Sequence, residues 1–225
     1  MTIQKGEGAM PEFVVHGIAG SPFVRAVQLV LEEKGADHRL QPMAPQEMRG
    51  QAHLQRHPFG RIPILEHGDF VLYETQAILR YVDAVLPEPR LRPTDPRAEA
   101  RMNQLIGVND WYFFPKVCAV IGFQRVVGPA LMGLIPDETA IAAALPDART
   151  SFAELNRLLG DKPFLVGDEL SLADLHLAPS IAFMAATPEG RQLMAGTRLA
   201  AWLERMEARP SMQATRPPEI FRPAA

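Results

Sequence analysis

Two short apolar runs separated by a turn form the clearest pattern in the chain. The runs cover residues 62–65 and 70–73, and a histidine, a glycine and an aspartate lie between them. Short apolar runs around such a turn predict a β-hairpin. A polar pair, Glu74 and Thr75, follows, and apolar residues then recur at helical spacing over residues 77–85. This change of period predicts a helix that begins near Thr75.

The stretch before the hairpin predicts two strands with a helix between them. Residues 13–15 are apolar and predict a strand, and a second strand is expected near residues 39–41. Ser21 precedes a proline, which is typical of a helix start, and a glycine after residue 34 should end that helix. Residues 45–57 are polar and predict a short, irregular helix. The order β-α-β followed by β-β-α is that of a thioredoxin-like domain.

The rest of the chain predicts helices only, after a linker rich in proline and charge. Glycines and prolines interrupt the helical pattern, and Pro146 is expected to shorten or kink the helix that contains it. The sequence therefore predicts an α+β protein. Its expected parts are a flexible tail over residues 1–10, a thioredoxin-like domain over 11–86, a linker over 87–95 and an all-α helical domain over 96–225.

Composition and charge narrow the classes of function. The 225 residues are 47% apolar, which is ample for a core, and the formal net charge of -3 with no long basic run argues against nucleic acid as a partner. No run approaches the roughly 18 apolar residues of a membrane span. The first residues lack the apolar core of a signal peptide. A single cysteine allows no internal disulfide and no cysteine-rich metal site. These features predict a cytoplasmic protein without a metal.

The hairpin also has the features of a peptide-binding edge. Pro63 cannot donate a hydrogen bond, so it belongs at an edge or a strand start. A cis peptide bond before it would turn the backbone outward. Ile62 could then offer its N–H and C=O to an extended ligand. Thr75 lies at a predicted helix start, where free N–H groups suit a carboxylate. Together these features predict a site for a small peptide with a free carboxylate.

The same stretch resembles the glutathione-site signature of the glutathione transferases, closest to the phi-like type: HPFGRIPILEHGDFVLYETQAI. The departures are His57 for asparagine, Arg61 for glutamine and Thr75 for serine; the arginine keeps the donors and the threonine keeps the hydroxyl. Two later stretches resemble the helical domain of the same superfamily, FLVGDELSLADLHLAPSI and WLERMEARPSM. The resemblance covers residues 13–212 and implies the thioredoxin-like and helical fold.

The resemblance implies that Ser21 is the catalytic residue. HGIAGSPFVRAV matches the family's loop after the first strand, and Ser21 falls at the serine of phi-like members. Its hydroxyl would donate to the glutathione sulfur and hold it as thiolate; the alternative is that Ser21 only caps a helix. His16 is a rival donor or base, or simply a strand-end histidine. Cys118 lies in an apolar helical stretch and is expected to be a buried structural residue. Cysteine-type members of the family carry their cysteine at the position of Ser21, which argues against a mainly thiol-exchange activity.

The resemblance also implies the residues that hold glutathione. Ile62, next to Pro63, would pair with the cysteinyl backbone. Glu74 would take the γ-glutamyl ammonium and Thr75 the neighbouring carboxylate. Arg61 matches the family's glutamine and could also reach a carboxylate of glutathione.

Four further positions have weaker signals. Arg49 falls where phi-like chains have a lysine that meets the glycyl carboxylate, although a solvated surface arginine fits equally well. Phe123 and Val127 match positions that line the apolar acceptor site, with helical core packing as the alternative. Asp174 lies in a Ser-x-x-Asp capping pattern, and helix nucleation is favoured over catalysis for it.

The resemblance thus implies a homodimeric glutathione transferase that conjugates glutathione to an apolar electrophile, with glutathione as co-substrate. A narrower glutathione-dependent activity is the first alternative: ether cleavage, isomerisation, dehalogenation or peroxide reduction. The second alternative is a non-catalytic binding module, because fold does not fix function. The identity of the electrophile does not follow from the sequence.

Overall fold

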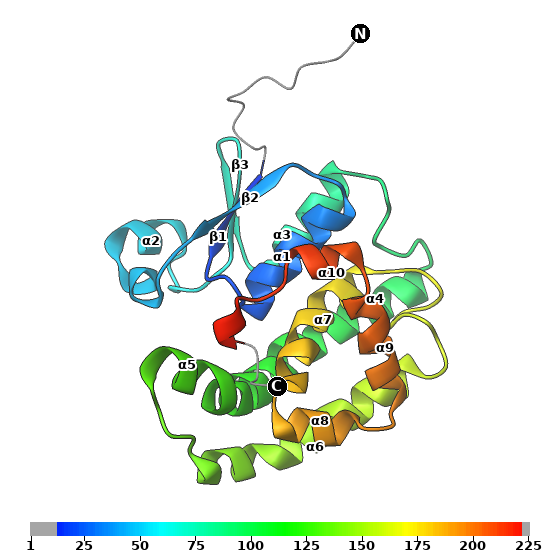
Figure 1. Cartoon of the computed structure of the whole chain (residues 1–225). Helices are drawn as coiled ribbons and strands as arrows, with labels where there is room; N and C mark the ends of the chain where they lie inside the picture. The colour runs from blue at the N-terminus through cyan, green and yellow to red at the C-terminus, as the bar shows by residue number, and fades with distance from the viewer. Residues whose placement is uncertain (1–12, 222–225) are drawn as a thin grey trace.

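A computed structural model describes residues 13–221. The expected tail over residues 1–10 lies outside the described residues. Figure 1 shows a sheet with its flanking helices in the upper part and a larger group of helices below it. The predicted thioredoxin-like part followed by a helical part is confirmed.

The sheet has four strands in the order β2-β1-β3-β4. β1 (Phe13–Gly17) pairs in parallel with β2 (His38–Pro42) and antiparallel with β3 (Ile64–His67), and β3 forms the predicted hairpin with β4 (Phe70–Tyr73). β3 begins two residues later than the apolar run, since Pro63 has no N–H to give to a ladder.

Two helices pack on one face of this sheet. They are α1 (Pro22–Glu33) and α3 (Thr75–Val85), and both begin where the sequence predicts. Side chains alternate along a strand, so Phe13 and Val15 point into this face and are fully buried. The polar stretch after β2 forms a 3₁₀ turn, η1 (Pro45–Arg49), and a short helix, α2 (Gln51–Arg56), as expected.

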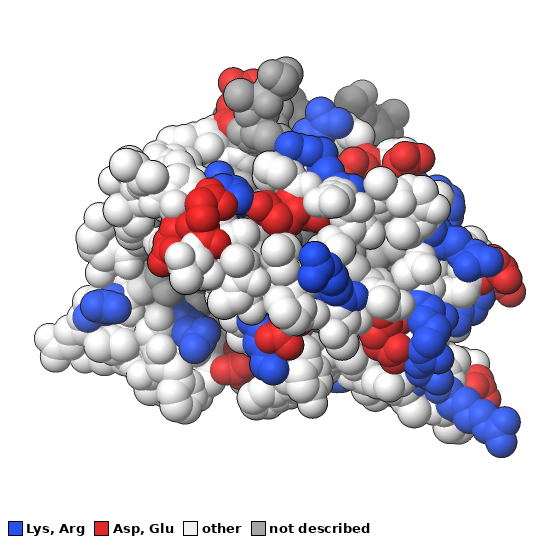
Figure 2. Space-filling model, turned by 90° about the horizontal axis from the view of Figure 1, so that it is seen from below, with Lys and Arg blue, Asp and Glu red and all other residues white. Residues whose placement is uncertain are grey.

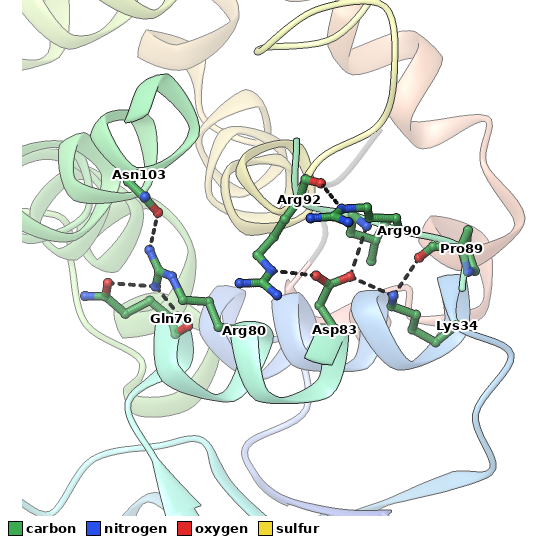
Figure 3. A network of polar contacts seen from close by, with 9 residues as sticks. Lys34, Gln76, Arg80, Asp83, Pro89, Arg90, Arg92 and Asn103 are labelled. Atoms are coloured by element: carbon green, nitrogen blue, oxygen red, sulfur yellow. Dashed lines mark hydrogen bonds and ion pairs between the residues drawn. The ribbon is translucent and has the colours of Figure 1, made fainter. Parts of the chain in front are cut away.

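A buried carboxylate anchors the linker to α3 (Figure 3). Asp83 accepts hydrogen bonds from Lys34 Nζ at 2.7 Å, from Arg92 Nε at 2.8 Å and from the N–H of Leu91 at 3.0 Å. Lys34 also donates to the carbonyl of Pro89. Burial alone would raise the pKa of Asp83, but these donors outweigh it and hold that pKa below its usual range. The linker is therefore fixed to the sheet-containing part by ionic and backbone contacts.

The helical part contains seven α-helices and two other helical segments within residues 13–221. They are α4 (Pro96–Val108), η2 (Asn109–Val127), α5 (Gly128–Met132), α6 (Glu138–Leu159), α7 (Leu172–Ala185), α8 (Pro188–Met194), α9 (Arg198–Glu207), α10 (Pro210–Ala214) and η3 (Glu219–Phe221). Asp95 caps the start of α4, since its side chain accepts from the N–H of Ala98.

η2 is a π-helix, which the sequence does not predict. In a π-helix each N–H bonds five residues back, and its last N–H, from Gly128, bonds the carbonyl of Phe123. Its buried positions recur about every fourth residue, at Asn109, Phe113, Val117, Cys118, Ile121, Gly122 and Val126. The wider turn keeps this one face directed into the core.

The expected effect of Pro146 on its helix is wrong in one respect. α6 runs without interruption from Glu138 to Leu159, so Pro146 does not shorten it. Pro146 and Ala142, four residues earlier, both lie on the exposed side of α6. The carbonyl that loses its partner therefore faces water, which can satisfy it.

α7 is the central helix, and Asp174 secures its start. Asp174 is fully buried and accepts from the N–H of Leu165, from the N–H and hydroxyl of Ser171 and from Trp202 Nε1, all within 3.0 Å. Burial raises the pKa of this carboxyl, and the four hydrogen bonds oppose that effect. The structural role predicted for Asp174 is confirmed.

One hydrophobic core joins the two parts of the molecule. Buried side chains from β1, α1 and α3 form a single cluster with those of η2, α6, α7 and α9. α1 packs against both α3 and α7, which places it between the sheet and the helical part. The N-terminal end of α1 therefore lies at the junction of the two parts.

Figure 2 shows the molecule from the side of the helical part. Acidic and basic side chains alternate over this face and do not gather into one basic patch. Met132, the last residue of α5, and Ile135, which follows the helix, are 60% and 90% exposed. Over residues 13–221, no helix combines the length and the apolar character needed to cross a membrane.

Candidate active site

The strand register brings three chain segments to one end of the sheet. His16, near the end of β1, pairs with Ile64 at the start of β3, and Ile64 pairs with Tyr73 at the end of β4. The loop that leads to Ser21, the Ile62–Pro63 segment and the Glu74–Thr75 pair therefore emerge at the same end. We call this arrangement the sheet-end site.

Ser21 precedes α1 and has extended backbone angles. Its N–H donates to the carbonyl of Ile18 at 3.1 Å, and its own carbonyl accepts from the N–H of Arg25. The side chain is half-buried and makes no capping hydrogen bond. The helix start is thus held by backbone bonds and by the proline that follows, and the Ser21 hydroxyl is available to a ligand.

The segment before β3 presents its backbone as expected. The Ile62–Pro63 peptide bond is cis, which confirms the hypothesis made from the sequence. Pro63 is buried and Ile62 is half-buried. The carbonyl of Arg61 is 2.8 Å from His53 Nε2, a contact that ties this segment to α2, while the Arg61 side chain is exposed.

Glu74 and Thr75 lie at the start of α3. Glu74 has φ 70°, the only positive φ among the non-glycine residues of 13–221. Such a conformation is costly and persists where the surroundings require it. The carbonyl of Glu74 accepts from the N–H groups of Ala77 and Ile78, and its side chain is exposed. Thr75 is only 8% exposed, next to the free N–H groups of the first turn.

Arg49 approaches the same region from η1. It is exposed, and the carbonyl of the preceding Met48 would lie 3.1 Å from a side-chain carbon placed on Gly60. Gly60 directly precedes Arg61, so the segments that carry the two arginines adjoin. Both arginines are exposed, and Arg61 directly precedes the cis Ile62–Pro63 bond.

His16 contacts two charged side chains. Its Nε2 is 2.9 Å from Glu66 of β3, and Arg56 of α2 lies 3.4 Å from its Nδ1 and also pairs with Glu66. Burial lowers the pKa of His16 and outweighs the opposing effect of Glu66. These contacts favour a structural strand-end histidine over the rival catalytic role.

The helical part approaches the start of α1 through aromatic side chains. Phe23, two residues after Ser21, packs on Phe114 of η2 with ring centroids 4.4 Å apart and lies 5.7 Å from His176 of α7. His176 is fully buried and bonds Asp110 at 2.6 Å. The four consecutive aromatics of η2 therefore divide: Phe113 is core, Phe114 meets α1, and Trp111 and Tyr112 are exposed.

Phe123 and Val127 lie in the last turns of η2 and are both half-buried. The Phe123 ring approaches Gly128, where an added side-chain carbon would be 3.5 Å from it. The contacts described for this pair lie within the helical part. Cys118 is fully buried, as predicted, and burial raises the pKa of its thiol well above the usual value. Within residues 13–221, no cluster of His, Cys, Asp and Glu side chains is placed to hold a metal ion.

Sequence reasoning missed the role of two histidines in supporting the sheet-end site. His53 bonds the backbone of Arg61, and His57 is 2% exposed with its ring stacked on Tyr73 at 4.5 Å. His57 thus packs beneath the end of β4 that leads to Glu74. The available signal was the departure of His57 from the asparagine of the family signature.

Family models match both parts of the chain. The model described as "Glutathione S-transferase, N-terminal domain" matches residues 15–90, and the one described as "Glutathione S-transferase, C-terminal domain" matches residues 138–205. Among curated relatives, the probable glutathione S-transferase GSTF2 of Oryza sativa subsp. japonica is 31% identical over 82% of this chain and 86% of its own. Glutathione S-transferase 4 of Zea mays is 32% identical over 90% and 91%.

Solved structures give the same result. Glutathione transferase F7 from Populus trichocarpa has a TM-score of 0.81 at 28% identity, covering 90% of this chain and 97% of its own. A glutathione S-transferase I bound with lactoylglutathione has a TM-score of 0.80 at 28% identity, covering 92% and 98%. The phi-like resemblance is confirmed, since these relatives are of the phi class. The chain therefore belongs to the glutathione S-transferase family.

Proposed function

We propose that this protein is a glutathione transferase that holds glutathione at the sheet-end site and conjugates it to an apolar electrophile. One observation carries the proposal: three features meet at the sheet-end site. They are a Ser21 hydroxyl that makes no capping hydrogen bond, the backbone at the cis Ile62–Pro63 bond, and the positive φ of Glu74 at the start of α3. The family relatives support the activity, because they are named glutathione S-transferases.

Each group has a distinct task in this proposal. The backbone of Ile62 pairs with the cysteinyl residue of glutathione, beside Pro63. Glu74 binds the γ-glutamyl ammonium, and Thr75 with the N–H groups of its helix binds the adjacent carboxylate. Arg49 and Arg61, exposed next to this edge, meet the negative charge of glutathione.

Ser21 lowers the pKa of the glutathione thiol. A free thiol has a pKa near 8.5, and each unit of lowering corresponds to about 1.4 kcal/mol of extra stabilisation of the thiolate. The Ser21 hydroxyl donates to the sulfur, and the start of α1 adds its dipole. The thiol proton leaves to solvent, the sulfur forms a bond to the electrophilic carbon, and the leaving group departs with the electron pair. The product is a thioether.

The acceptor site is proposed to lie across the junction from Ser21, with Phe123 and Val127 among its apolar groups. The solved structure of a β-etherase from Sphingobium sp. strain SYK-6 is 22% identical to this chain and supports the shared fold alone. No contact in the sheet-end site favours ether cleavage or another narrower reaction over conjugation.

The test is the thiolate absorbance of bound glutathione against pH. We expect the wild type to lower the thiol pKa by about two units, or about 2.7 kcal/mol, and Ser21→Ala to lose most of this shift. Ser180→Ala is the matched control, because the Ser180 hydroxyl is buried without a hydrogen-bond partner in residues 13–221. Turnover of an aromatic electrophile should fall with the thiolate fraction in Ser21→Ala only.

Two results would contradict parts of this proposal. Glutathione bound with an unshifted thiol in the wild type, and no turnover, would replace the transferase with a binding module. A shift that survives in Ser21→Ala would leave the enzyme but remove Ser21 from the chemistry.

We further propose a cytoplasmic homodimer in which the sheet-containing part of one subunit meets the helices of the other. Exposed apolar groups on both parts support this arrangement: Phe70 and Val71 on edge strand β4, and Trp111 and Tyr112 on η2. Light scattering on the wild type and on a Trp111→Arg variant tests it. The division into parts over residues 11–86 and 96–225, with a linker over 87–95, stays a prediction.

A further inference from the structure

The segment that carries Arg49 has little apolar packing to fix it. It consists of η1 and α2, residues 45–56, and we call it the η1–α2 segment. η1 buries none of its side chains, and α2 buries only His53. Within residues 13–221, the hydrophobic core cluster contains no residue of this segment. The position of the segment therefore depends on polar contacts with the sheet.

Arg56, the last residue of α2, makes such a contact. Its guanidinium donates to Glu66 of β3, and its Nη1 lies 3.4 Å from Nδ1 of His16 on β1. The other ring nitrogen of His16, Nε2, is 2.9 Å from the Glu66 carboxylate. His53 makes a further contact, with the carbonyl of Arg61. Arg56, Glu66 and His16, which we call the Arg56 cluster, thus join α2 to two strands.

Strand register brings the two sheet residues of the Arg56 cluster together. Glu66 pairs with Val14, and His16 lies two residues farther along β1, so both side chains point to the same face of the sheet. Phe13 and Val15 point to the opposite face, which α1 and α3 cover. The cluster therefore holds α2 against the face that those two helices do not cover.

The protonation state of His16 determines whether the Arg56 cluster is complete. An arginine side chain can only donate, so its contact with Nδ1 requires that nitrogen to carry no proton. Glu66 of β3, Arg56 of α2 and Arg39 of β2 are the charged groups within residues 13–221 that face His16. Burial lowers the pKa of His16, the two arginines act in the same direction, and Glu66 opposes them. His16 is therefore neutral at pH 7.5, and a proton added to Nδ1 at lower pH sets one cation against another.

We propose that Arg56 is a positioning residue for glutathione, and that proton uptake by His16 displaces it. With the Arg56 cluster complete, the segment of Arg49 stays against that of Arg61, beside the cis Ile62–Pro63 bond. When the cluster is broken, the segment can occupy other positions, and apparent affinity falls with the fraction of molecules that keep it in place. This inference rests on the proposed function, because it concerns the same site, and it makes co-substrate binding depend on pH.

Calorimetric titration with S-methylglutathione tests the proposal, because this probe has no thiol whose ionisation would contribute to a pH series. At pH 7.5, Arg56→Met should raise the Kd about fivefold, the upper range for a partly exposed ion pair. Arg56→Lys, which keeps the charge, should restore part of the lost affinity. Arg97→Met removes an equal charge from an exposed position on α4 and should bind like the wild type.

The pH profile separates positioning from a general loss of stability. Between pH 7.5 and pH 5, the Kd of the wild type should rise about threefold more than that of His16→Gln. Glutamine offers an acceptor to Arg56 and a donor to Glu66 at every pH. His38→Gln removes a histidine on β2 outside the Arg56 cluster and should keep the profile of the wild type.

Hydrogen exchange without any ligand gives an independent measurement. Amides of the η1–α2 segment should exchange about threefold faster in Arg56→Met than in the wild type, whereas those of α1 should be unchanged. Thermal unfolding of each variant identifies any that are misfolded. The exchange rates report on the Arg56 cluster even in a protein that binds no glutathione.

Three outcomes would overturn the proposal alone. One is equal affinity of the wild type and folded Arg56→Met for S-methylglutathione at pH 7.5. Another is a pH profile of His16→Gln that coincides with that of the wild type. The third is unchanged exchange of the η1–α2 segment in Arg56→Met. Failure of the wild type to bind the probe at any pH would instead overturn the proposed function and, with it, the role of Arg56 in glutathione binding.

Discussion

The sheet-end site and the helical part present their functional groups in different ways. At the sheet end, backbone at Ile62 and the start of α3 do much of the proposed binding, and the groups come from chain segments joined by strand pairing. In the helical part, contacts are made by side chains from elements far apart in sequence, such as Asp110 of η2 and His176 of α7, which are 66 residues apart. Strand register determines the first arrangement, and packing between helices determines the second.

This difference bears on how the protein divides its tasks. A site built from backbone tolerates changes such as arginine for glutamine at position 61. A site built from packed side chains changes its shape when one of them changes. The sheet end is thus suited to one constant co-substrate, and the helical part to a variable acceptor.

The largest expected effect tests how far the helical part depends on single buried side chains. Asp174→Ala should lower the free energy of unfolding by about 3–5 kcal/mol, because it leaves buried donors at Leu165, Ser171 and Trp202 without an acceptor. Urea denaturation measures this loss. Asp95→Ala, an exposed N-cap on α4, is the control and should cost about 1 kcal/mol. Equal losses of unfolding free energy in the two variants would show that the buried carboxylate of Asp174 stabilises the protein no more than an exposed helix cap does.

A second prediction concerns the hydroxyl at the sheet end. Thr75→Val keeps the shape of a side chain that is 8% exposed but removes its hydroxyl. Glutathione affinity should fall about tenfold, or about 1.4 kcal/mol, while stability changes little. Thr75→Ser, which restores the hydroxyl, should bind within about twofold of the wild type. Calorimetry with glutathione checks both, and an unaltered affinity in Thr75→Val would show that backbone alone binds this carboxylate.

A smaller effect is expected from the acceptor side. Phe123→Ala should raise the KM for an aromatic electrophile about threefold, or about 0.7 kcal/mol, and leave the KM for glutathione unchanged. Its partial burial at the end of η2 explains the modest size. Steady-state kinetics with each substrate varied in turn gives the two constants. A change confined to the glutathione KM would contradict the separation of the two regions.

The smallest effect is a pH dependence of stability at the junction. Burial acts to raise the pKa of Glu33, but hydrogen bonds from Arg209 and Ser211 outweigh it, so this pKa lies below its ordinary value. Glu33 therefore stabilises the folded protein above about pH 4.3, which is the pKa of a glutamate in the unfolded chain. This stabilisation is lost as the pH falls through the lower pKa of Glu33 in the folded protein.

The magnitude for Glu33 should be about 0.5 kcal/mol, because Arg209 is partly exposed and the pair is screened. Denaturation from pH 6 down to pH 3 should show a shallower loss in Glu33→Gln than in the wild type. An identical slope in both would mean that other carboxyls account for the acid sensitivity.

The sheet end could be predicted from the sequence because its signals are local. The hairpin, the proline before β3 and the Ser21-Pro22 start of α1 each occupy a few consecutive residues. Their spatial meeting then follows from strand pairing. The burial of the His57 ring against Tyr73 was not predicted, because the departure of His57 from the family's asparagine does not reveal where the ring packs.

The helical part shows why the remainder did not follow from sequence. η2 is apolar on many sides, so its pattern does not distinguish a π-helix from an α-helix, and the inward face stayed unassigned. Pro146 does not shorten its helix, because the sequence pattern does not reveal that water can satisfy the freed carbonyl on the exposed side. The hydrogen bonds of Arg25 to Met212 and Thr215 depend on where the C-terminal helices lie, and no local signal in the sequence reports that.

The single hydrophobic core limits how such a molecule can be recombined. Because α1 belongs to the sheet-containing part yet buries its apolar face against α7, exchanging one part for that of a relative would replace only half of a packed interface. A chimera joined within the linker should therefore unfold more easily than either parent unless α1 and α7 come from the same source. For protein engineering, α1 and α7 must be exchanged together, even though some 140 residues of chain separate them.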